Sequence, residues 1–472
     1  MQLIGLELND IGIIAAGGEP VRLLEIDDQA FESPGFALPE KGRILVGKSA
    51  EHKARLLPRH ILNHFWDQLN TEPLQHPSPH TPQNHAEIVY SHLARIWEQT
   101  QKHGNQIVLA VPSFYDREQL GLILGITREL SMPVRAFVPS ALAAAPTVKP
   151  DRMLLHLEIH LHRIEVVYLE QDEYLSVKDS ETVGENGLIH LQKDWVDMIA
   201  QEFVRKTRFD PYHQASSEQD LYDRIPEILR ELAHNPSFVF EVTGGTKSYS
   251  VTLTRNQFVQ KSEAVYRKLL QMIEKMRNRY KSDHSAITLQ LTQRLSQLPG
   301  CKEFLSSIND VQIIELDQGA GALGILQIWD DLSENRNTEE ISFFTRRPWQ
   351  PGRESNTDGE TPVRGDKRCP THVLYRSIAY PISEEPLLVG RDIASGRAGV
   401  RIQGKIAGVS RKHCSIRRHG REVILEDCSS YGTFVNDHRV TDKTTLKLGQ
   451  IIRVGTPGEE LHLIASLDHD ET

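Results

Sequence analysis

The chain has 472 residues, more than one compact core usually organises, so two or three domains are expected. Its composition, 39% hydrophobic and 25% charged residues, is that of a globular protein. The formal net charge of −10 disfavours a general nucleic-acid binder, and no apolar run is long enough for membrane insertion. The four cysteines show no CxxC spacing, which indicates reduced thiols of a cytoplasmic protein rather than disulfides or a zinc site.

The first two thirds of the chain alternate between short aliphatic runs and segments with helical spacing of apolar residues. This alternation is typical of an α/β domain, which we expect to extend over residues 1–332. The predicted strands are 3–8, 11–16, 21–26, 106–113 and a pair within 153–170, and the predicted helices are 86–101, 117–130, 188–207 and 259–280.

The pattern changes twice after residue 332. Residues 333–370 are polar and rich in Gly, Pro, Asn and charge, which predicts a flexible linker. From residue 371 to 472, short β-rich runs alternate with Gly, Ser and Asp turns, which predicts an all-β sandwich.

Four motifs follow one another in the predicted sandwich: LLVGRD (387–392), GVSRKHCSI (408–416), LEDCSSYGTFVN (425–436) and LKLGQIIRVG (446–455). In this order they resemble the forkhead-associated (FHA) domain, whose members bind phosphothreonine peptides. The surrounding charge agrees, because residues 384–421 hold nine Lys or Arg and three Asp or Glu within an acidic chain. A guanidinium offers the planar fork of donors that a phosphate dianion requires.

The resemblance implies roles for individual residues. Arg391 and Ser410 would hold the phosphate, and Arg411 would reach a phosphate oxygen or the peptide backbone. Ser430 and Tyr431 would lie on the loop that faces the peptide, and Tyr431 stands where the family commonly has Asn, which implies altered selectivity. The residues implied to be structural are His413, Gly432, Thr433 and Asn436. The alternative is that the conserved-looking residues only brace turns and bind no ligand.

The first domain has a second, weaker resemblance, to the DnaK-type members of the actin-like ATPase superfamily. IGLELNDIGI (4–13) is similar to the first phosphate loop of that family, and 108–145 to its VPAYFND…NEPTAAALA segment. Residues 251–276, 291–300 and 317–324 are similar to its ITLTR helix entry, adenosine motif and final helix. The implied fold class is a two-lobed α/β actin-like ATPase fold, here degenerate, followed by the all-β FHA sandwich.

The glycine-dependent loops of that family carry side chains in this sequence. The first loop has Glu7, Asn9 and Asp10 where a metal-water ligand and phosphate-approaching residues are expected, and an added carboxylate repels a polyphosphate. A Cβ at a phosphate-loop glycine obstructs backbone contact with the phosphates. In the second loop, EIHLHRIE, Glu158 is followed by His160 and His162 at glycine places, and the adenosine loop has Gln293 and Arg294. We therefore expect a pseudo-ATPase with no catalytic residue, cofactor or metal.

Two further patterns invite other interpretations. GRILVGKS (42–49) fits the P-loop expression, but its four variable residues predict a strand rather than an anion cradle. His156, Glu158, His160 and His162 offer metal-ligating side chains, but neighbours two apart on a strand diverge along the pleat. A polar face, exposed where nucleotide binds in the family, is the favoured interpretation of the histidines.

The sequence thus predicts a cytoplasmic, non-enzymatic adaptor that binds a phosphothreonine-containing protein through its FHA domain, with the DnaK-like domain as an interaction platform. One alternative is a live, divergent ATPase or chaperone regulated by phosphopeptide binding, and another is a structural subunit with phosphate-independent contacts. Linker threonines 338, 345, 357 and 361 are candidate phosphorylation sites for self-association. Neither nucleic-acid binding nor membrane insertion is expected.

Overall fold

The computed structural model divides the chain into two compact units, Met1–Arg353 and Glu354–Thr472. The residues that it describes are 2–40, 42–74, 82–145, 152–244, 247–280, 286–333, 341–348, 370–375, 378–393, 399–402, 408–419, 422–436, 438–447, 450–455 and 458–464. Within these ranges, no helix has the length and apolarity that crossing a membrane requires.

Two large sheets organise the first unit, and they share one strand order. In each sheet, three consecutive strands form an antiparallel meander: β1, β2 and β3 in the first sheet, and β9, β10 and β11 in the second. Two later strands extend each sheet in parallel beside the first strand of the meander: β7 and then β8 beside β1, and β14 and then β15 beside β9. The first sheet contains β1 (Leu3–Glu7), β2 (Ile13–Gly17), β3 (Arg22–Leu24), β4 (Glu32–Ser33), β7 (Gln106–Val111), β8 (Val134–Pro139) and β16 (Ser342–Phe343). The second contains β9 (Arg152–Ile159), β10 (Arg163–Gln171), β11 (Tyr174–Gly184), β14 (Ala286–Leu291), β15 (Val311–Glu315) and β17 (Arg346–Pro348).

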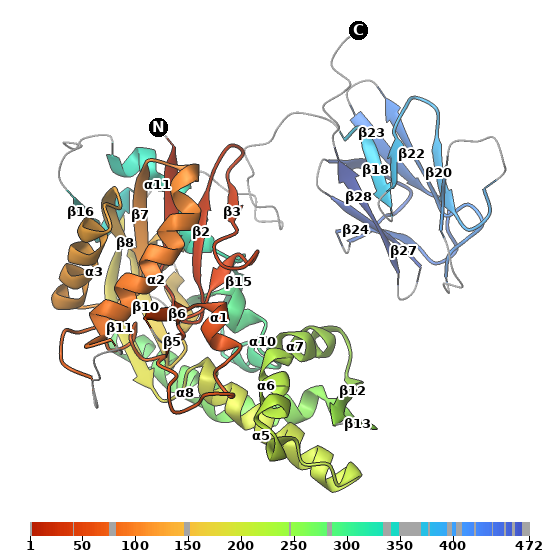
Figure 1. Cartoon of the computed structure of the whole chain (residues 1–472). Helices are drawn as coiled ribbons and strands as arrows, with labels where there is room; N and C mark the ends of the chain where they lie inside the picture. Colours follow the sequence, from red (N-terminus) through yellow and green to blue (C-terminus); the bar gives the residue numbers. More distant parts are fainter. Residues whose placement is uncertain are drawn as a thin grey trace. The chain divides into compact units, whose positions relative to one another are not determined.

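Helices cover both sheets and fill the space between them (Figure 1). The helices are α1 (Lys48–Glu51), α2 (His85–Thr100), α3 (Arg117–Glu129), α4 (Ser140–Ala144), α5 (Leu188–Thr207), α6 (Ala215–Asp223), α7 (Ile225–His234), α8 (Arg255–Arg279), α9 (Gln293–Ser296), α10 (Cys301–Leu305) and α11 (Ala320–Ser333), with 3-10 turns at Gln101–His103 and Pro211–His213. Apolar residues of α2 and α3 share a core with the first sheet, and those of α5 and α8 share one with the second. A third core joins α4 and α11 to strands of both sheets, so burial of apolar surface holds the two halves together.

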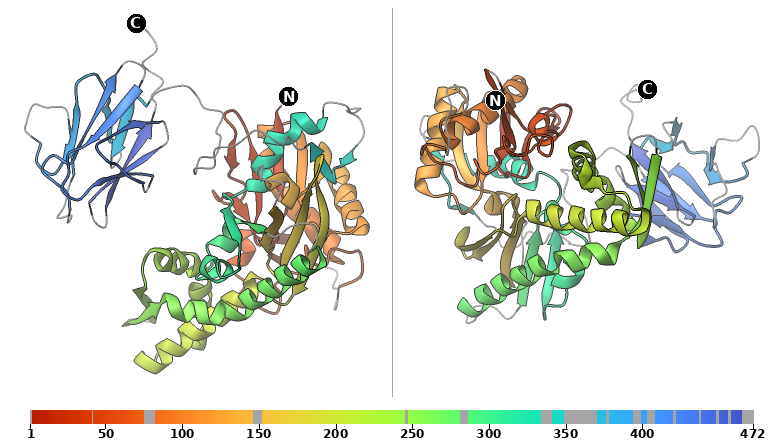
Figure 2. Two further views of the ribbon diagram at one scale, coloured as in Figure 1. Left: turned by 180° about the vertical axis from the view of Figure 1, so that it is seen from behind. Right: turned by 60° about the horizontal axis from the view of Figure 1, so that its bottom comes forward.

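Two hairpins extend this framework. The pair β12 (Ser237–Gly244) and β13 (Lys247–Thr254) lies with α6 and α7 beside α5 and α8, as the two views in Figure 2 show. The pair β5 (Ala37–Glu40) and β6 (Arg43–Val46) precedes α1. Helix α8 begins at Arg255, four residues before the predicted start, because the Gln257 side chain accepts hydrogen bonds from both the backbone N–H and the hydroxyl of Thr254.

The prediction of a flexible linker over 333–370 was wrong for residues 342–348, which contribute two strands to the first unit. Strand β16 pairs in parallel with β8 at one edge of the first sheet, and β17 pairs with β11 at one edge of the second. Phe344, between the two strands, is buried in the core that α4 and α11 share. These seven residues thus belong to the first unit because they complete two sheet edges and bury an aromatic side chain. Residues 334–340 and 349–369 lie outside the described ranges, and Thr338, Thr357 and Thr361 are among them.

The second unit is a sandwich of two antiparallel-rich sheets, as predicted from the short β-rich runs. One sheet contains β18 (His372–Tyr375), β19 (Ile378–Pro381), β24 (Thr433–Val435), β25 (His438–Arg439), β27 (Ile451–Val454) and β28 (Glu459–Ile464). The other contains β20 (Leu387–Gly390), β21 (Gly399–Arg401), β22 (Cys414–His419), β23 (Glu422–Asp427) and β26 (Lys443–Leu446). Alternate side chains from both sheets form one apolar core between them.

A buried polar chain centred on His92 anchors α2 in the first unit. The Trp66 indole N–H donates to His92 Nδ1 at 3.0 Å, so the proton of the neutral ring lies on Nε2, 2.8 Å from the Ser33 hydroxyl. Ser33 in turn donates to Asp27 at 2.7 Å. Complete burial of His92 lowers its pKa to about 3, since the ring cannot be hydrated when charged.

His92 therefore links stability to pH. Its folded pKa lies below the unfolded value of about 6.5, so its contribution is full above pH 6.5 and is lost as the pH falls from there towards 3. We expect His92→Gln to flatten the pH dependence of the unfolding free energy by up to ~1.4 kcal/mol per pH unit in this window. Urea unfolding of both proteins between pH 7 and 4 measures the two slopes, and parallel slopes would contradict this assignment.

Candidate functional site: the loop pocket and the filled cleft

The ends of β20 and β22 bring two of the predicted phosphate-binding segments together. Arg391 N–H donates to the Ser410 carbonyl and Asp392 N–H to the Arg411 carbonyl, each at 3.2 Å. The close approach requires Gly390, because a Cβ on that residue would stand 2.2 Å from the Arg411 carbonyl oxygen. Among the described residues, neither the Arg391 nor the Arg411 guanidinium has a hydrogen bond or ion pair, and both side chains are exposed.

Ser410 connects this pair of segments to a third. Its hydroxyl oxygen accepts a hydrogen bond from Ser430 N–H at 3.2 Å, which leaves the hydroxyl proton able to donate to a further group. Tyr431 follows with 70% of its surface exposed. Three separate stretches of sequence are thus held next to one another by hydrogen bonds, and together they contain Arg391, Ser410, Arg411, Ser430 and Tyr431.

His413 lies beneath these loops and is fully buried. Its Nδ1 accepts from Ser410 N–H at 3.1 Å, so Nε2 carries the proton and faces the Gly432 carbonyl at 3.2 Å. Burial lowers the pKa of the His413 ring, which keeps it in this neutral, two-contact form. The side chain therefore fixes the spacing between the segments that contain Ser410 and Gly432.

Asp427 organises the Ser430 loop, a role that the motif comparison missed. One carboxylate oxygen accepts from Ser429 N–H at 3.0 Å and from the Thr433 hydroxyl at 2.7 Å. The Ser429 hydroxyl in turn accepts from Gly432 N–H at 2.7 Å. An Asp followed two residues later by Ser is a signal for such a side-chain-to-backbone turn. Asn436 lies further along, where its side chain accepts from Ile451 N–H at 3.0 Å.

The family comparison agrees with this geometry. Residues 387–455 match the family model of the FHA domain. An FHA domain is a protein-interaction module of the phosphothreonine-peptide-binding kind. No curated protein matches the chain.

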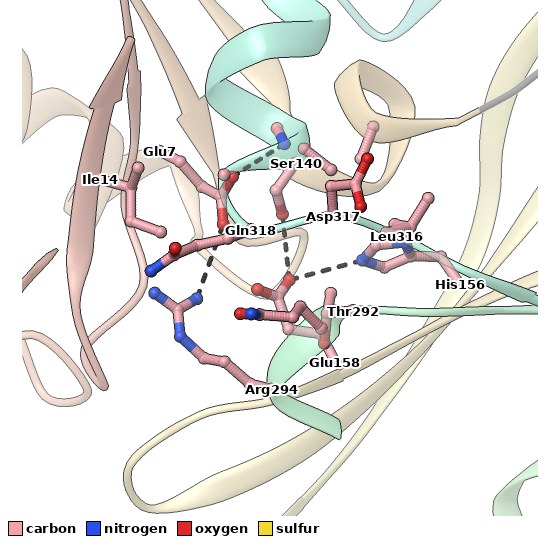
Figure 3. A pocket seen from close by; sticks show the side chains of 15 residues that line it. Glu7, Ile14, Ser140, His156, Glu158, Thr292, Arg294, Leu316, Asp317 and Gln318 are labelled. Carbon is pink, nitrogen blue, oxygen red and sulfur yellow. Dashed lines mark hydrogen bonds and ion pairs between the residues drawn. The ribbon is translucent and has the colours of Figure 1, made fainter. Parts of the chain in front are cut away.

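In the first unit, the segments expected to form a nucleotide site meet between the two sheets, but side chains fill the space (Figure 3). The remaining cavity, lined in part by Glu7, Ser140, His156, Glu158 and Arg294, has a volume of about 20 Å³. A cavity of this size holds about one water molecule, whereas sites for small ligands generally measure about 300–1,000 Å³.

Arg294 bridges the two halves of this cleft. It extends from α9 to Glu7 at 3.6 Å and Glu32 at 3.4 Å, and it donates to the Gly12 carbonyl. The Glu7 carboxylate also accepts from Gly321 and Ala322 N–H, at 2.8 and 3.1 Å, at the start of α11. Burial raises the pKa of Glu7, against the attraction of Arg294. The contacts thus join Glu7 of the expected first phosphate loop to Arg294 of the expected adenosine loop. Gln293, the other residue of the expected adenosine loop, lines the same cavity.

Asn9 and Asp10 make a second connection between the sheets. Asn9 donates to Glu158 at 2.7 Å and to the Ile159 carbonyl at 3.1 Å, and Asp10 accepts from Leu161 N–H at 2.7 Å. Burial would raise the pKa of Glu158, but the attraction of His160 and His156 and the Asn9 bond hold it at about 2. Glu158 is therefore a buried carboxylate whose orientation is fixed by hydrogen bonds.

The expectation of an exposed histidine face was wrong. His156, Glu158, His160 and His162 are 6% exposed or less, and only the first two lie on β9, while the others belong to the turn before β10. His162 points towards the Asn63 carbonyl, 3.0 Å from its Nε2, and stacks on His64. The turn is pulled into the interior because its backbone bonds to Asp10, a tertiary contact that strand periodicity does not contain.

The GRILVGKS segment forms a strand, β6, followed by the four-residue helix α1. The place that an anion would take is occupied by Asp27, whose carboxylate accepts from Lys48 N–H at 2.8 Å. A Cβ on Gly47, which has a φ of 69°, would stand 2.0 Å from that carboxylate oxygen. This segment therefore binds the protein's own carboxylate where a P-loop binds phosphate.

We expect Arg294→Met to lower the unfolding free energy of the first unit on the order of 3 kcal/mol, because it leaves buried carboxylates without their cation. Arg267→Met, which removes only an exposed ion pair with Glu263, is the matched control and should cost below about 0.5 kcal/mol. Adding Glu7→Gln to Arg294→Met should restore part of the loss. Chemical unfolding followed by tryptophan fluorescence measures all four proteins, and equal losses for Arg294→Met and Arg267→Met would contradict the bridging role.

Proposed function

We propose that the chain is a non-enzymatic adaptor that binds a phosphothreonine-containing protein through the loop pocket of its FHA domain. The observation that carries this proposal is the meeting of Arg391, Ser410 and Ser430 at one set of loops whose spacing His413 maintains. A phosphate placed there receives charge-assisted bonds from Arg391 and the Ser410 hydroxyl, and Arg411 stands beside them. Both arginine side chains are exposed, so their guanidinium groups can reach a ligand.

Tyr431 stands where the family commonly has Asn, so we expect it to contact the peptide in a different way. An amide at this place bonds to the peptide main chain, whereas a phenol ring offers a broad apolar face with a polar tip. Because 70% of Tyr431 is exposed, the ring can cover a peptide side chain next to the phosphothreonine. Selectivity then depends on an apolar or aromatic neighbour of the phosphothreonine rather than on main-chain bonding alone.

Arg391→Ala should weaken binding of a phosphothreonine peptide between about 10- and 100-fold, which corresponds to the loss of charge-assisted hydrogen bonds of 1.5–3 kcal/mol. Ser410→Ala should weaken it by a smaller factor. Arg417→Ala removes an equally exposed arginine from β22 and serves as the matched control. Fluorescence anisotropy with phosphorylated and unphosphorylated forms of each peptide provides the measurement. Equal binding of the two peptide forms would instead support phosphate-independent contacts, as in a structural subunit.

We further propose that the first unit is a degenerate actin-like domain that serves as an interaction platform and does not hydrolyse ATP. Its two sheets with one strand order support the relation to that superfamily, since the resemblance implies a two-lobed α/β fold. The filled cleft supports the loss of the nucleotide, because Arg294, Glu7, Asn9 and Glu158 bond to one another's segments across it. Opening it for ATP would break these buried contacts and bring phosphates beside carboxylates.

The alternative of a live ATPase is tested by nucleotide titration. We expect no change in the melting temperature of the full chain at 1 mM Mg–ATP and no phosphate release above background. A nucleotide that bound with a Kd of about 10 μM would stabilise the first unit by roughly 2.7 kcal/mol at that concentration, an effect that thermal unfolding detects. Such a shift, or turnover that disappears in Glu7→Gln, would overturn the pseudo-ATPase assignment.

A further inference from the structure

Two buried glutamates face each other inside the first unit. Glu158 on β9 and Glu165 on β10 are direct cross-strand partners, so their side chains point to the same side of the second sheet. Glu158 is 2% exposed and Glu165 is 0% exposed. Like charges directly opposite each other destabilise a strand pair, and burial removes the water that would screen them. The pair therefore requires a cation.

His160, in the turn that joins the two strands, directs its ring at both carboxylates. Its Nε2 lies 3.4 Å from Glu165 Oε2 and 4.0 Å from Glu158 Oε2. Yet, among the residues that the structure describes, neither ring nitrogen of His160 and neither carboxylate oxygen of Glu165 has a hydrogen-bond partner, although all four atoms are buried. One ligand atom from each of the three residues lies within 4.8 Å of the other two.

Neighbouring residues orient Glu158 and His160 through contacts of the kind that usually surround metal ligands. Asn9 and the Ser140 hydroxyl donate to Glu158, at 2.7 and 3.3 Å, which orients its carboxylate. Asp10 lies 3.8 Å from His160 Nδ1, on the side of the ring opposite Glu165. The Phe114 ring meets the His160 ring edge to face at 5.0 Å and contributes an apolar wall. A carboxylate behind a ligating imidazole and donors to a ligating carboxylate are the common outer contacts of such sites.

We propose that Glu158, His160 and Glu165 bind one divalent transition-metal ion, zinc or manganese, which closes the cleft in place of a nucleotide. Ligand atoms about 2.0–2.2 Å from one ion lie on the order of 3–3.6 Å apart. The distance from His160 to Glu165 is already in this range at 3.4 Å, while the other two sides of the triangle, at most 4.8 Å long, must shorten. An imidazole with two carboxylates suits these ions, while magnesium and calcium prefer all-oxygen sites. His156 Nε2 lies 3.5 Å from Glu158 and is buried with no hydrogen bond to any described residue, so it is available as a further contact. The proposal is independent of phosphopeptide binding by the FHA domain.

The site is tested on the full chain after dialysis against a chelator. The stripped protein is incubated with zinc, manganese, magnesium or calcium chloride, passed through gel filtration and analysed for metal by mass spectrometry. Surface histidines bind metal adventitiously, so the decisive quantity is the difference between wild type and Glu165→Gln. The matched control is Glu170→Gln on the same strand, whose carboxylate pairs with Lys178 near the surface.

We expect wild type and Glu170→Gln to retain one more equivalent of zinc or manganese than Glu165→Gln, and to melt at a higher temperature with the metal than without it. Glu165→Gln should bind about 100-fold more weakly. With cobalt chloride, the visible absorption of a bound ion should arise in the first two proteins only. If Glu165→Gln does not fold, as judged by circular dichroism, His160→Gln provides the same comparison. Equal metal content and equal melting shifts in wild type and the folded variant would show an internal ion pair only and overturn the proposal.

Discussion

The first unit depends on charged side chains that meet between its two sheets. Arg294 reaches from the second half to Glu7, Glu32 and the Gly12 carbonyl of the first, and Asn9 reaches back to Glu158. Buried charges are costly unless they are paired, so each of these groups requires its partner on the opposite half. The apolar core around α4 and α11 brings the sheets together, and the polar contacts then determine how closely the cleft can shut.

This arrangement leaves little open space between the two sheets. Side chains from both halves supply the contacts across the cleft, and a cavity of about 20 Å³ remains. Opening the cleft would break buried ion pairs and hydrogen bonds, so these contacts hold the two halves of the unit in a fixed arrangement.

In the FHA domain, by contrast, the loops are fixed while the arginine side chains on them are exposed. The buried His413 and the partly buried Asp427 bond to backbone groups and a hydroxyl group, which fixes the loops, while the Arg391 and Arg411 side chains are exposed. Affinity for a phosphate benefits when the donors are held near their final places before binding, because less conformational freedom is then lost. In the first unit the guanidinium group of Arg294 is paired with carboxylates, whereas in the FHA domain the Arg391 and Arg411 side chains are exposed.

Several features followed from the sequence because they are local. Aliphatic runs and helical spacing identified β1, β7, α2, α3 and α5 to within a few residues, and four ordered motifs identified the FHA domain. By contrast, strand register decides that His160 is buried and that Glu158 lies opposite Glu165. Residues 342–348 join two sheet edges, and this depends on which edges the other strands leave unpaired. The sequence by itself determined the elements and the chemistry available; only the tertiary structure decided which charges meet, because those pairs join residues up to about 300 positions apart that no local pattern connects.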